Sequence, residues 1–444
     1  MRTEFIVRVA IVIPPIRDFY FTTQRASFLG PLTISRLLDV AGIEHRVFNA
    51  VRSRGRRIEL PEELSHLRHY LGTPGFFKEY RRYGIEEEAT ASRIADWRPD
   101  IVLISCFAFG YAADAISLSR AIRRVLPRTV QFAGGAGVSA YPEYFIRNGA
   151  VDYAVRGEVD ASLVELIMHP DDFHAGDSVI TDPIMRLNGA PFAPVLTVIR
   201  ESVDTMFFST MITRGCPRRC SFCSVRLCFP EYRRTSLADV ERMFSSIPRT
   251  RKKIHVNFED DTLATDMDFL VESLDILDRY SGGNFSFSME NGVDFRTLNP
   301  DILSLLKRRN LSKLNISLVS VDASTLSDPE RRYTLDEFEE IARASTALGI
   351  KVTAYLISGL PGEGYYSIEA GIDFLSRLPV LIGISTFYPV PGIHGFTDKT
   401  LFDDISPSLC RSTSFYGWSD CTTEQLVSLF LKARSINRDS AERT

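Results

Sequence analysis

The sequence lacks an excess of charge of either sign. Its 52 Lys and Arg residues nearly balance 56 Asp and Glu residues, which gives a formal net charge of −4. A chain without a field of one sign has no general attraction for nucleic acid or for an anionic membrane surface. It also lacks a basic groove with interleaved aromatic residues, the pattern that points to RNA. We therefore expect no nucleic-acid partner.

The N-terminal region lacks a hydrophobic run long enough to span a bilayer. The apolar stretch from Phe5 to Pro15 contains Arg8, is too short for a membrane span and has no small-residue cleavage site. It predicts a buried strand and no membrane partner. The hydrophobic fraction of 45% and charged fraction of 24% are typical of a globular protein with sizeable cores.

Cysteine is present in an odd number and is unevenly spread. Three of the seven cysteines fall between positions 216 and 223. This crowding suits metal ligation in a reducing compartment better than a disulfide framework. We therefore expect a cytoplasmic protein.

Residues 1–168 alternate short β-rich runs with amphipathic segments, which predicts an α/β domain. Its Rossmann-like, doubly wound parallel sheet would bind a ligand at the carboxyl ends of its strands. The polar segment 52–98 is expected to be an excursion within this domain. The predicted strands are Val7–Ile13, His45–Asn49, Ile101–Ser105, Val130–Ala133 and Val151–Val155. Helices are predicted around Ala112–Val125 and Ser162–Met168.

A second series of strands and helices follows an expected linker at 169–205. Residues 206–395 carry six strand–helix units, which predict a partial (β/α)6 TIM-type barrel with its chemistry at the C-terminal strand ends. Residues 396–444 are expected to form a tail that packs on the barrel. The predicted strands are Phe207–Ile212, Ile254–Phe258, Phe285–Met289, Leu314–Leu318, Val352–Ile357 and Ile382–Phe387.

Cys216, Cys220 and Cys223 form a CxxxCxxC motif directly after the first barrel strand. Three thiolates can ligate three irons of a [4Fe–4S] cluster and leave the fourth iron open to a ligand. A structural zinc site is the alternative. It would need a fourth ligand, the usual CxxC pairs are missing, and Cys228 has the wrong spacing for a zinc finger.

The motif resembles that of the radical S-adenosylmethionine (SAM) superfamily, with Phe222 as the aromatic residue before the last cysteine. The resemblance implies that SAM chelates the open iron and is cleaved to a 5′-deoxyadenosyl radical. It also implies an external electron donor such as a flavodoxin or ferredoxin. The protein would mainly hold and orient the cofactors.

Later strand ends resemble the family's SAM-contacting segments in the same order. Asp260 or Asp261 would meet the SAM amino group, with a helix-capping cluster as the alternative. The turn that starts at Gly359 resembles the family's Gly-Leu-Pro-Gly-Glu turn and would approach SAM closely. A plain structural turn is the alternative. The family's usual Glu-Ser pair is replaced by Val319 and Ser320, which leaves the carboxylate after the fourth strand in doubt. The further expected contacts are Asn291 and Ser317.

The N-terminal half resembles the cobalamin-binding domain that precedes the barrel in one branch of radical SAM enzymes. Small residues at the strand ends would let a flat corrin approach the sheet. The Asp-x-His-x-x-Gly motif is absent, so we expect no histidine on cobalt from that motif. A domain that binds nothing, or another ligand, is the alternative. The expected cobalamin contacts are Pro14, Ser105, Phe107, Gly134, Gly135, Gly157 and Glu158.

Together the two resemblances imply a cobalamin-dependent radical SAM methyltransferase that methylates an unactivated carbon of a small metabolite. Two alternatives remain: a radical SAM rearrangement or cyclisation without methyl transfer, and a non-catalytic iron–sulfur sensor. Cys106 is expected to be a buried small hydrophobe. Cys228, Cys410 and Cys421 could hold an auxiliary cluster, although they are scattered along the chain.

Overall fold

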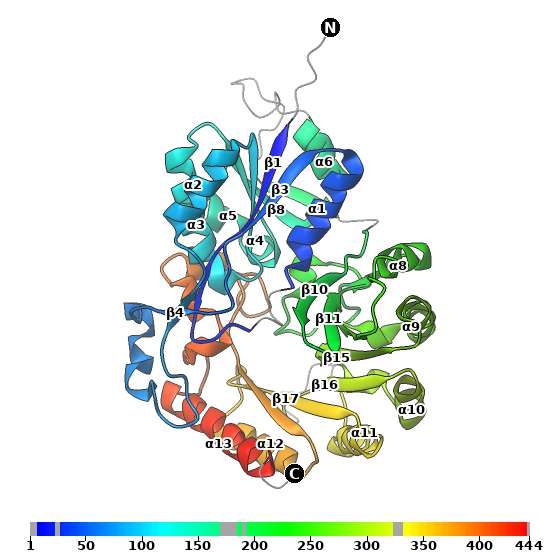
Figure 1. Ribbon diagram of the computed structural model, residues 1–444. Helices are drawn as coiled ribbons and strands as arrows, with labels where there is room; N and C mark the ends of the chain where they lie inside the picture. The colour runs from blue at the N-terminus through cyan, green and yellow to red at the C-terminus, as the bar shows by residue number, and fades with distance from the viewer. Residues whose placement is uncertain (1–6, 23–26, 169–183, 189–191, 323–331, 442–444) are drawn as a thin grey trace.

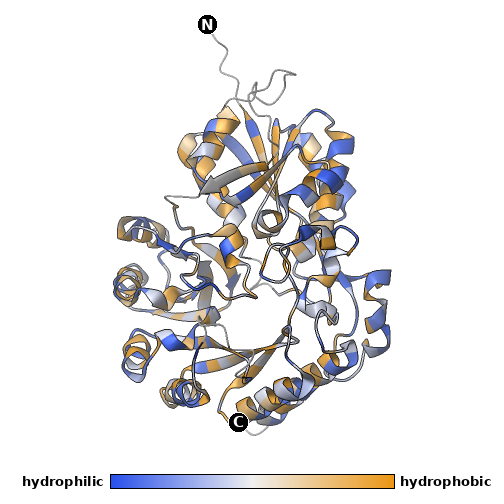
Figure 2. Cartoon of the chain, turned by 180° about the vertical axis from the view of Figure 1, so that it is seen from behind, coloured by the Kyte–Doolittle hydropathy of each residue, from blue (hydrophilic) through white to orange (hydrophobic). Residues whose placement is uncertain are grey.

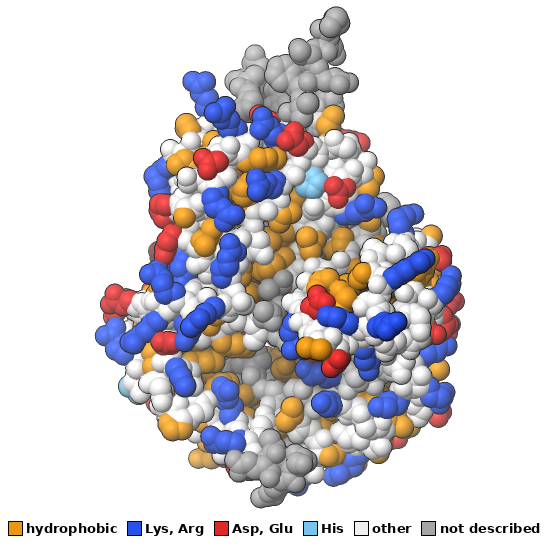
Figure 3. Space-filling model, viewed as in Figure 1, with side chains coloured by type: hydrophobic (Ala, Val, Ile, Leu, Met, Phe, Trp, Pro, Cys, Tyr) orange, Lys and Arg blue, Asp and Glu red, His pale blue; other side chains and the backbone are white. Residues whose placement is uncertain are grey.

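Two mostly parallel β-sheets organise the chain in the computed structural model, which describes residues 7–22, 27–168, 184–188, 192–322 and 332–441. The first sheet and its helices form the N-terminal lobe of Figure 1, and the second sheet forms the larger lobe below it. In Figure 3, basic and acidic side chains are scattered over the visible face and do not gather in one patch.

The N-terminal sheet has six parallel strands in the order β3-β1-β6-β7-β8-β9. Both of its faces are covered by helices, which explains the nearly continuous apolar runs of its inner strands. The predicted doubly wound sheet is confirmed. Its strands are β1 (Arg8–Ile13), β3 (Glu44–Asn49), β6 (Ile101–Ser105), β7 (Val130–Gly134), β8 (Tyr153–Glu158) and β9 (Ile184–Asn188).

Successive residues of β1 serve different cores. Val9 and Ile11 pack with Leu38 and Ile167 on one face, whereas Val12 packs with Leu118 on the other. Every side chain of a strand that is covered on both faces is buried, so alternation by polarity is lost. The helices are α1 (Leu29–Ala41), α2 (Glu87–Trp97), α3 (Ala112–Val125), α4 (Ala136–Ala140), α5 (Pro142–Asn148) and α6 (Ala161–Met168).

The segment expected as an excursion forms a small antiparallel sheet and a 3₁₀ helix. The sheet has the order β2-β5-β4, with β2 (Ile16–Asp18), β4 (Arg56–Arg57) and β5 (Arg81–Tyr83). The helix η2 (Glu62–Tyr70) precedes Phe76 and Phe77, which contact Phe415 and Phe430 from the other end of the chain. The excursion therefore joins the N-terminal lobe to the C-terminal segment.

The expected linker 169–205 contains two strands in the structure. β9 adds a sixth strand to the N-terminal sheet by pairing with β8, and β10 (Thr197–Glu201) pairs antiparallel with the first barrel strand. β9 is short and follows Pro183, so nothing local in the sequence predicts it. Its place is set by a partner strand that lies earlier in the chain.

The C-terminal sheet has the order β10-β11-β14-β15-β16-β17-β18, and the six strands after β10 are parallel. Figure 1 shows its helices along the outer side of the strands. This open arrangement confirms the predicted partial barrel. Its strands are β11 (Thr205–Thr210), β14 (Lys253–Phe258), β15 (Phe285–Val293), β16 (Leu311–Val319), β17 (Lys351–Ser358) and β18 (Leu381–Thr386).

Side-chain caps fix where the barrel helices begin. Ser236, Asp266 and Asn299 each accept a backbone N–H of the helix that they precede. Thr334 and Glu337 form a capping box. Figure 2 shows hydrophobic and hydrophilic residues side by side on these helices, as expected for amphipathic helices. They are α8 (Leu237–Phe244), α9 (Met267–Ser281), α10 (Pro300–Arg308), α11 (Leu335–Ala347) and α12 (Tyr365–Ser376).

The C-terminal segment contacts both lobes. Its long helix α13 (Thr423–Ala441), which the sequence analysis does not predict, packs against α12 and β18. Before it, the buried Arg411 donates from Nε to the Gly110 carbonyl at 2.7 Å, and its guanidinium lies 4.3 Å from the Tyr111 ring centroid. Within the described ranges, no helix combines the length and the apolar character that a membrane span requires.

Candidate active site

The three cysteines of the CxxxCxxC motif lie in one loop beyond the carboxyl end of β11. The loop leaves β12 (Thr213–Arg214) and returns through β13 (Arg233–Arg234), which pairs antiparallel with β12. The Cys223 amide donates to the Cys220 carbonyl at 3.1 Å, which makes a tight turn at the end of the motif. The two short strands therefore close the loop that carries all three thiols.

None of the seven cysteines, all of which lie in the described ranges, forms a disulfide. Desolvation by burial raises the pKa of Cys216 and raises the pKa of Cys223 to about 11, so iron binding would release protons. Among the described residues, no three His, Cys, Asp or Glu side chains converge on a single ion. Thiolates that bind three different irons of a cube need not meet at one point, so this arrangement is compatible with a cluster.

Asp260 holds the backbone that leads into the cysteine loop. Its buried Oδ1 accepts from the amides of Ile212 and Thr213 at 3.0 and 2.5 Å and from Thr213 Oγ1 at 2.6 Å. Burial nevertheless raises the pKa of Asp260 to about 7, because desolvation outweighs these hydrogen bonds. The helices and 3₁₀ turn that follow begin at other residues, so Asp260 caps none of them.

Asp261 supports the entrance of the same loop. Its Oδ2 accepts from the Gly215 amide at 3.2 Å. Gly215 has a φ of 74°, and a Cβ at this position would lie 2.3 Å from the Glu231 carbonyl oxygen. Only glycine fits this close approach between the two ends of the loop.

The remaining residues expected near SAM lie at the ends of the next three barrel strands. Asn291 Nδ2 donates to the Glu259 carbonyl at 3.0 Å, which ties the ends of β14 and β15 together. Ser317 is adjacent, since a Cβ on Gly292 would lie 3.0 Å from its Oγ. Gly359 follows β17 with a φ of 80°. The sheet therefore gathers Asn291, Ser317 and Gly359 at the edge that carries the cysteine loop.

Val319 marks the strand end where the sequence departs from the family pattern. Its φ of 71° is rare for a β-branched residue and signals local strain. Its side chain packs in a buried apolar cluster with Leu360 and Phe387, against which Phe222 of the cysteine motif also packs. Next to it, Ser320 Oγ donates to the buried Glu363, whose pKa burial raises to about 7. An apolar side chain thus stands where the family's usual pattern has a carboxylate.

A cavity of about 390 Å³ opens at the carboxyl ends of the N-terminal strands. Gly135 has a φ of 109°, and a Cβ there would lie 2.5 Å from the Cys106 carbonyl oxygen, so this part of the wall must be bare. Pro14, although expected at the site, is not part of the lining. Six of the seven residues expected at cobalamin line the cavity: Ser105, Phe107, Gly134, Gly135, Gly157 and Glu158.

The barrel completes the wall of this cavity. Met211, Arg214, Cys228, Glu259 and Asn291 come from the strand ends and the loop around the cysteine motif. The cavity therefore lies where the carboxyl ends of both sheets face each other.

Glu259 bridges the two lobes at the cavity. Its carboxylate accepts from Ser27 Oγ at 2.8 Å and from Ser209 Oγ, and burial raises its pKa. The sequence analysis does not predict Glu259, Ser27 or the start of α1, although all of them line the cavity or contact its wall. The connection that follows the first strand of a doubly wound sheet is a general ligand site, and this rule could have pointed to α1.

The other four cysteines lie in buried surroundings. Cys228 Sγ lies 3.7 Å from the Gly157 carbonyl oxygen at the cavity, and burial raises its pKa to about 12. Cys106 and Cys410 belong to the N-terminal core, as a buried small hydrophobe would, and Cys421 belongs to the barrel core. The structure therefore does not bring Cys228, Cys410 and Cys421 together.

Comparisons with known proteins match both lobes. Residues 210–375 match the radical SAM superfamily, and residues 64–167 match the B12 binding domain. The chain is 24% identical over 369 residues to a hopanoid C-3 methylase from Methylococcus capsulatus, covering 75% of this chain and 70% of that protein. It is also 24% identical to the cobalamin-dependent radical SAM methyltransferase TokK from Streptomyces tokunonensis, over 62% of this chain and 45% of TokK.

A solved structure shows the same fold. The radical SAM methyltransferase TsrM from Kitasatospora setae, with cobalamin and a [4Fe–4S] cluster bound, superposes with a TM-score of 0.62 at 14% identity. The match covers 87% of this chain and 76% of TsrM. The two domain matches make a [4Fe–4S] cluster, SAM and cobalamin the cofactors of this chain. The chain belongs to the radical SAM superfamily, in the branch whose members carry a B12-binding domain ahead of the radical SAM domain.

Proposed function

We propose that this enzyme is a cobalamin-dependent radical SAM methyltransferase that acts on an unactivated carbon of a small polar molecule. The shared cavity carries this proposal. Ser105, Gly134 and Gly157 of one sheet face Glu259 and Asn291 of the other across the same space. A methyl carrier in the first lobe and a radical source in the second would then act on one substrate without an intervening wall.

When bound, the cluster with SAM supplies a radical that removes a hydrogen atom, and cobalamin supplies the methyl group. In this proposal Cys216, Cys220 and Cys223 hold the cluster, and Phe222 packs behind them against the Val319 cluster. The chain's own contribution is to hold these groups in place and to keep water from them.

Asp260 is the favoured contact for the SAM amino group. Its Oδ2 is buried and has no hydrogen-bond partner within the described part of the chain, whereas Oδ1 is fully used by the loop backbone. A buried carboxylate oxygen without a donor supports an ammonium ligand there. Asp261, Asn291, Ser317, Ser320 and Gly359 would surround the rest of SAM at the same strand ends.

Phe107 supports a flat ligand on the N-terminal side. Its ring is 45% exposed, lines the cavity and lies 4.6 Å from the Tyr111 ring. A large aromatic surface left open beside bare glycines suits the face of a corrin. With Ser105, Gly134, Gly135 and Gly157, it would form the cobalamin site.

The inner face of the barrel sheet supports a polar substrate. Ile254, Val256 and Phe258 of β14 pack in the hydrophobic core, so the alternate residues His255 and Asn257 belong to the opposite face.

Side chains across the inner face contact one another through polar atoms. The ring nitrogens of His255 form hydrogen bonds with the hydroxyls of Ser286 and Ser288. Burial lowers the pKa of His255 to about 4, so its ring is neutral at pH 7. Lys313 and Glu290 form an ion pair on the same face, with 38% and 27% of their side chains exposed. A hydrocarbon substrate would desolvate these charged groups without replacing their hydrogen bonds.

Transfer of a labelled methyl group should identify the substrate class. We expect holoenzyme that is supplied with SAM carrying a deuterated methyl group to label a water-soluble compound in an extract of the source cells. Mass spectrometry of the aqueous and lipid fractions makes the comparison. Label confined to the lipid fraction would contradict a polar substrate.

We also propose that an external protein supplies the electron and that the enzyme works in a reducing compartment. Pro217, Arg219 and Ser221 of the cysteine loop are exposed, which supports access by an external reductant such as a flavodoxin or ferredoxin. Seven described cysteines without a disulfide support a reducing compartment such as the cytoplasm.

Product analysis tests the proposed reaction. Reconstituted holoenzyme with reductant, SAM and the source-cell extract is expected to form S-adenosylhomocysteine and 5′-deoxyadenosine in about equal amounts, because one SAM gives the methyl group and another gives the radical. The formation of 5′-deoxyadenosine alone would indicate a rearrangement or cyclisation. The formation of neither would favour an iron–sulfur sensor.

A further inference from the structure

Glu158 joins the two lobes at the base of the cysteine loop. Its carboxylate stands at the carboxyl end of β8 with 9% of the side chain exposed, and Oε1 accepts from Arg214 Nε at 2.8 Å. Oε2 accepts from Arg233 Nη2. Arg214 and Arg233 are partners across the β12–β13 pair, so one carboxylate of the N-terminal lobe holds both strands that close the loop.

The loop touches the N-terminal lobe at a second place. Its short helix α7 (Val225–Cys228) packs against α4 and β8, where Cys228 Sγ lies 3.7 Å from the Gly157 carbonyl oxygen. Gly157 is itself fixed by Ser139 Oγ, which accepts from its amide at 3.0 Å. The loop is therefore attached to the cavity wall both at its base and beyond the last cysteine of the motif.

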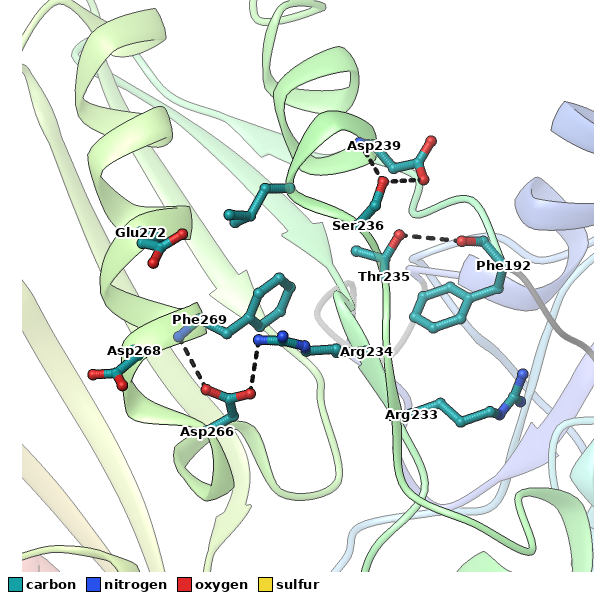
Figure 4. A pocket seen from close by; sticks show the side chains of 11 residues that line it. Phe192, Arg233, Arg234, Thr235, Ser236, Asp239, Asp266, Asp268, Phe269 and Glu272 are labelled. Atoms are coloured by element: carbon teal, nitrogen blue, oxygen red, sulfur yellow. Dashed lines mark hydrogen bonds and ion pairs between the residues drawn. The ribbon is translucent and has the colours of Figure 1, made fainter.

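Consecutive arginines of β13 serve different partners. Figure 4 shows Arg234 turned toward Asp266 at the start of α9, with the ion pair at 2.8 Å, and Arg233 turned to the other side. Both line a pocket of about 920 Å³, but only Arg233 reaches Glu158. Arg234 therefore attaches β13 to the barrel, and Arg233 attaches it to the N-terminal lobe.

We propose that Glu158 is a positioning residue that fixes the cysteine loop, and with it the cluster, relative to the cobalamin cavity. This inference rests on the proposed function, because it takes the cluster and cobalamin to occupy the sites described above. Arg214 is only 5% exposed and Arg233 20%, so without the carboxylate two poorly hydrated cations would face each other. The ion pairs that hold the β12–β13 pair to β8 would be lost, and the repulsion between the two arginines would disturb the pair itself.

The spin–spin interaction between the reduced cluster and cob(II)alamin tests this role, because it reports how the two cofactors are placed. We expect Glu158→Gln holoenzyme to keep wild-type iron and cobalt contents. Its electron paramagnetic resonance lines should be broader than those of the wild type, because the distance between the two cofactors becomes variable. The ratio of 5′-deoxyadenosine to S-adenosylhomocysteine should rise about tenfold, because a small misplacement uncouples the two half-reactions. The matched control is Arg234→Gln, which should match the wild type in both measurements, because the Arg234–Asp266 ion pair is exposed to solvent and contributes little.

Several results would overturn the proposal. A wild-type spectrum and product ratio in Glu158→Gln would show that the carboxylate does not set the geometry. Selective loss of cobalamin would make Glu158 a cobalamin contact instead. If Glu158→Gln does not fold, Arg233→Gln removes one arm while Arg214 still neutralises the carboxylate, and an unchanged spectrum in that variant would also overturn it.

The failure of this inference differs from the failure of the proposed function. A wild-type enzyme that binds both cofactors yet forms no S-adenosylhomocysteine would contradict methyl transfer. The spectra of Glu158→Gln and Arg234→Gln would still show whether Glu158 positions the cluster.

Discussion

Replacing Cys216 with alanine is expected to lower 5′-deoxyadenosine formation by at least about 100-fold, which exceeds what the loss of a supporting residue near a metal costs. The same result is expected for Cys220→Ala and Cys223→Ala. Each thiol is the proposed ligand of a different iron, and the loop that carries them offers no spare cysteine, since Cys228 contacts Gly157 at the cavity. High-performance liquid chromatography of quenched anaerobic reactions measures the product directly.

The matched control for these variants is Cys410→Ala. Cys410 is buried in the core shared with the N-terminal lobe, and burial raises its pKa to about 12, so it remains a thiol. Its replacement should leave SAM cleavage within about threefold of wild type, because a small core truncation costs only stability. Full SAM cleavage by Cys216→Ala would contradict the assignment of the motif to the cluster.

Replacing Gly134 with leucine should weaken cobalamin binding and leave SAM cleavage intact. A Cβ at Gly134 would meet only Val155 at 3.8 Å, an ordinary contact, so the backbone accepts a side chain. The leucine would occupy part of the cavity of about 390 Å³. We expect cobalamin affinity to fall about 10- to 100-fold, as overpacking of 1–3 kcal/mol implies, while 5′-deoxyadenosine formation continues.

Equilibrium dialysis of hydroxocobalamin against the variant gives the affinity. Ala238→Leu, at an exposed position of α8, is the control for adding the same side chain and should bind as the wild type does. Wild-type affinity in Gly134→Leu would place cobalamin outside the cavity. Loss of both cofactors together would show that the substitution disturbs the whole fold.

Local patterns predict much of this enzyme. The spacing of Cys216, Cys220 and Cys223 is a property of eight consecutive residues, and the apolar strand runs are equally local. Strand ends also follow from the runs, and parallel strands bring their carboxyl ends to one edge. For this reason residues such as Ser105, Gly134 and Asn291 could be assigned to the edge at the carboxyl ends of their sheets from the sequence alone.

Contacts between distant segments could not be predicted in this way. Glu158 meets Arg214 and Arg233 only because the two sheets face each other, and Ser27 reaches Glu259 across 232 positions of the chain. The strand β9 shares this property, since its place depends on β8 alone. These nonlocal contacts determine how the two cofactor sites are joined, and that geometry is the part that the sequence does not reveal.

The claim that one chain holds a cluster and a corrinoid in adjoining sites is tested most directly by the cofactor content of the anaerobically purified protein. Metal analysis with an ultraviolet–visible spectrum, after reconstitution with iron, sulfide and hydroxocobalamin, is expected to show about four irons and one cobalt per chain. A chain that retains the iron and its spectrum but no corrinoid would contradict the claim.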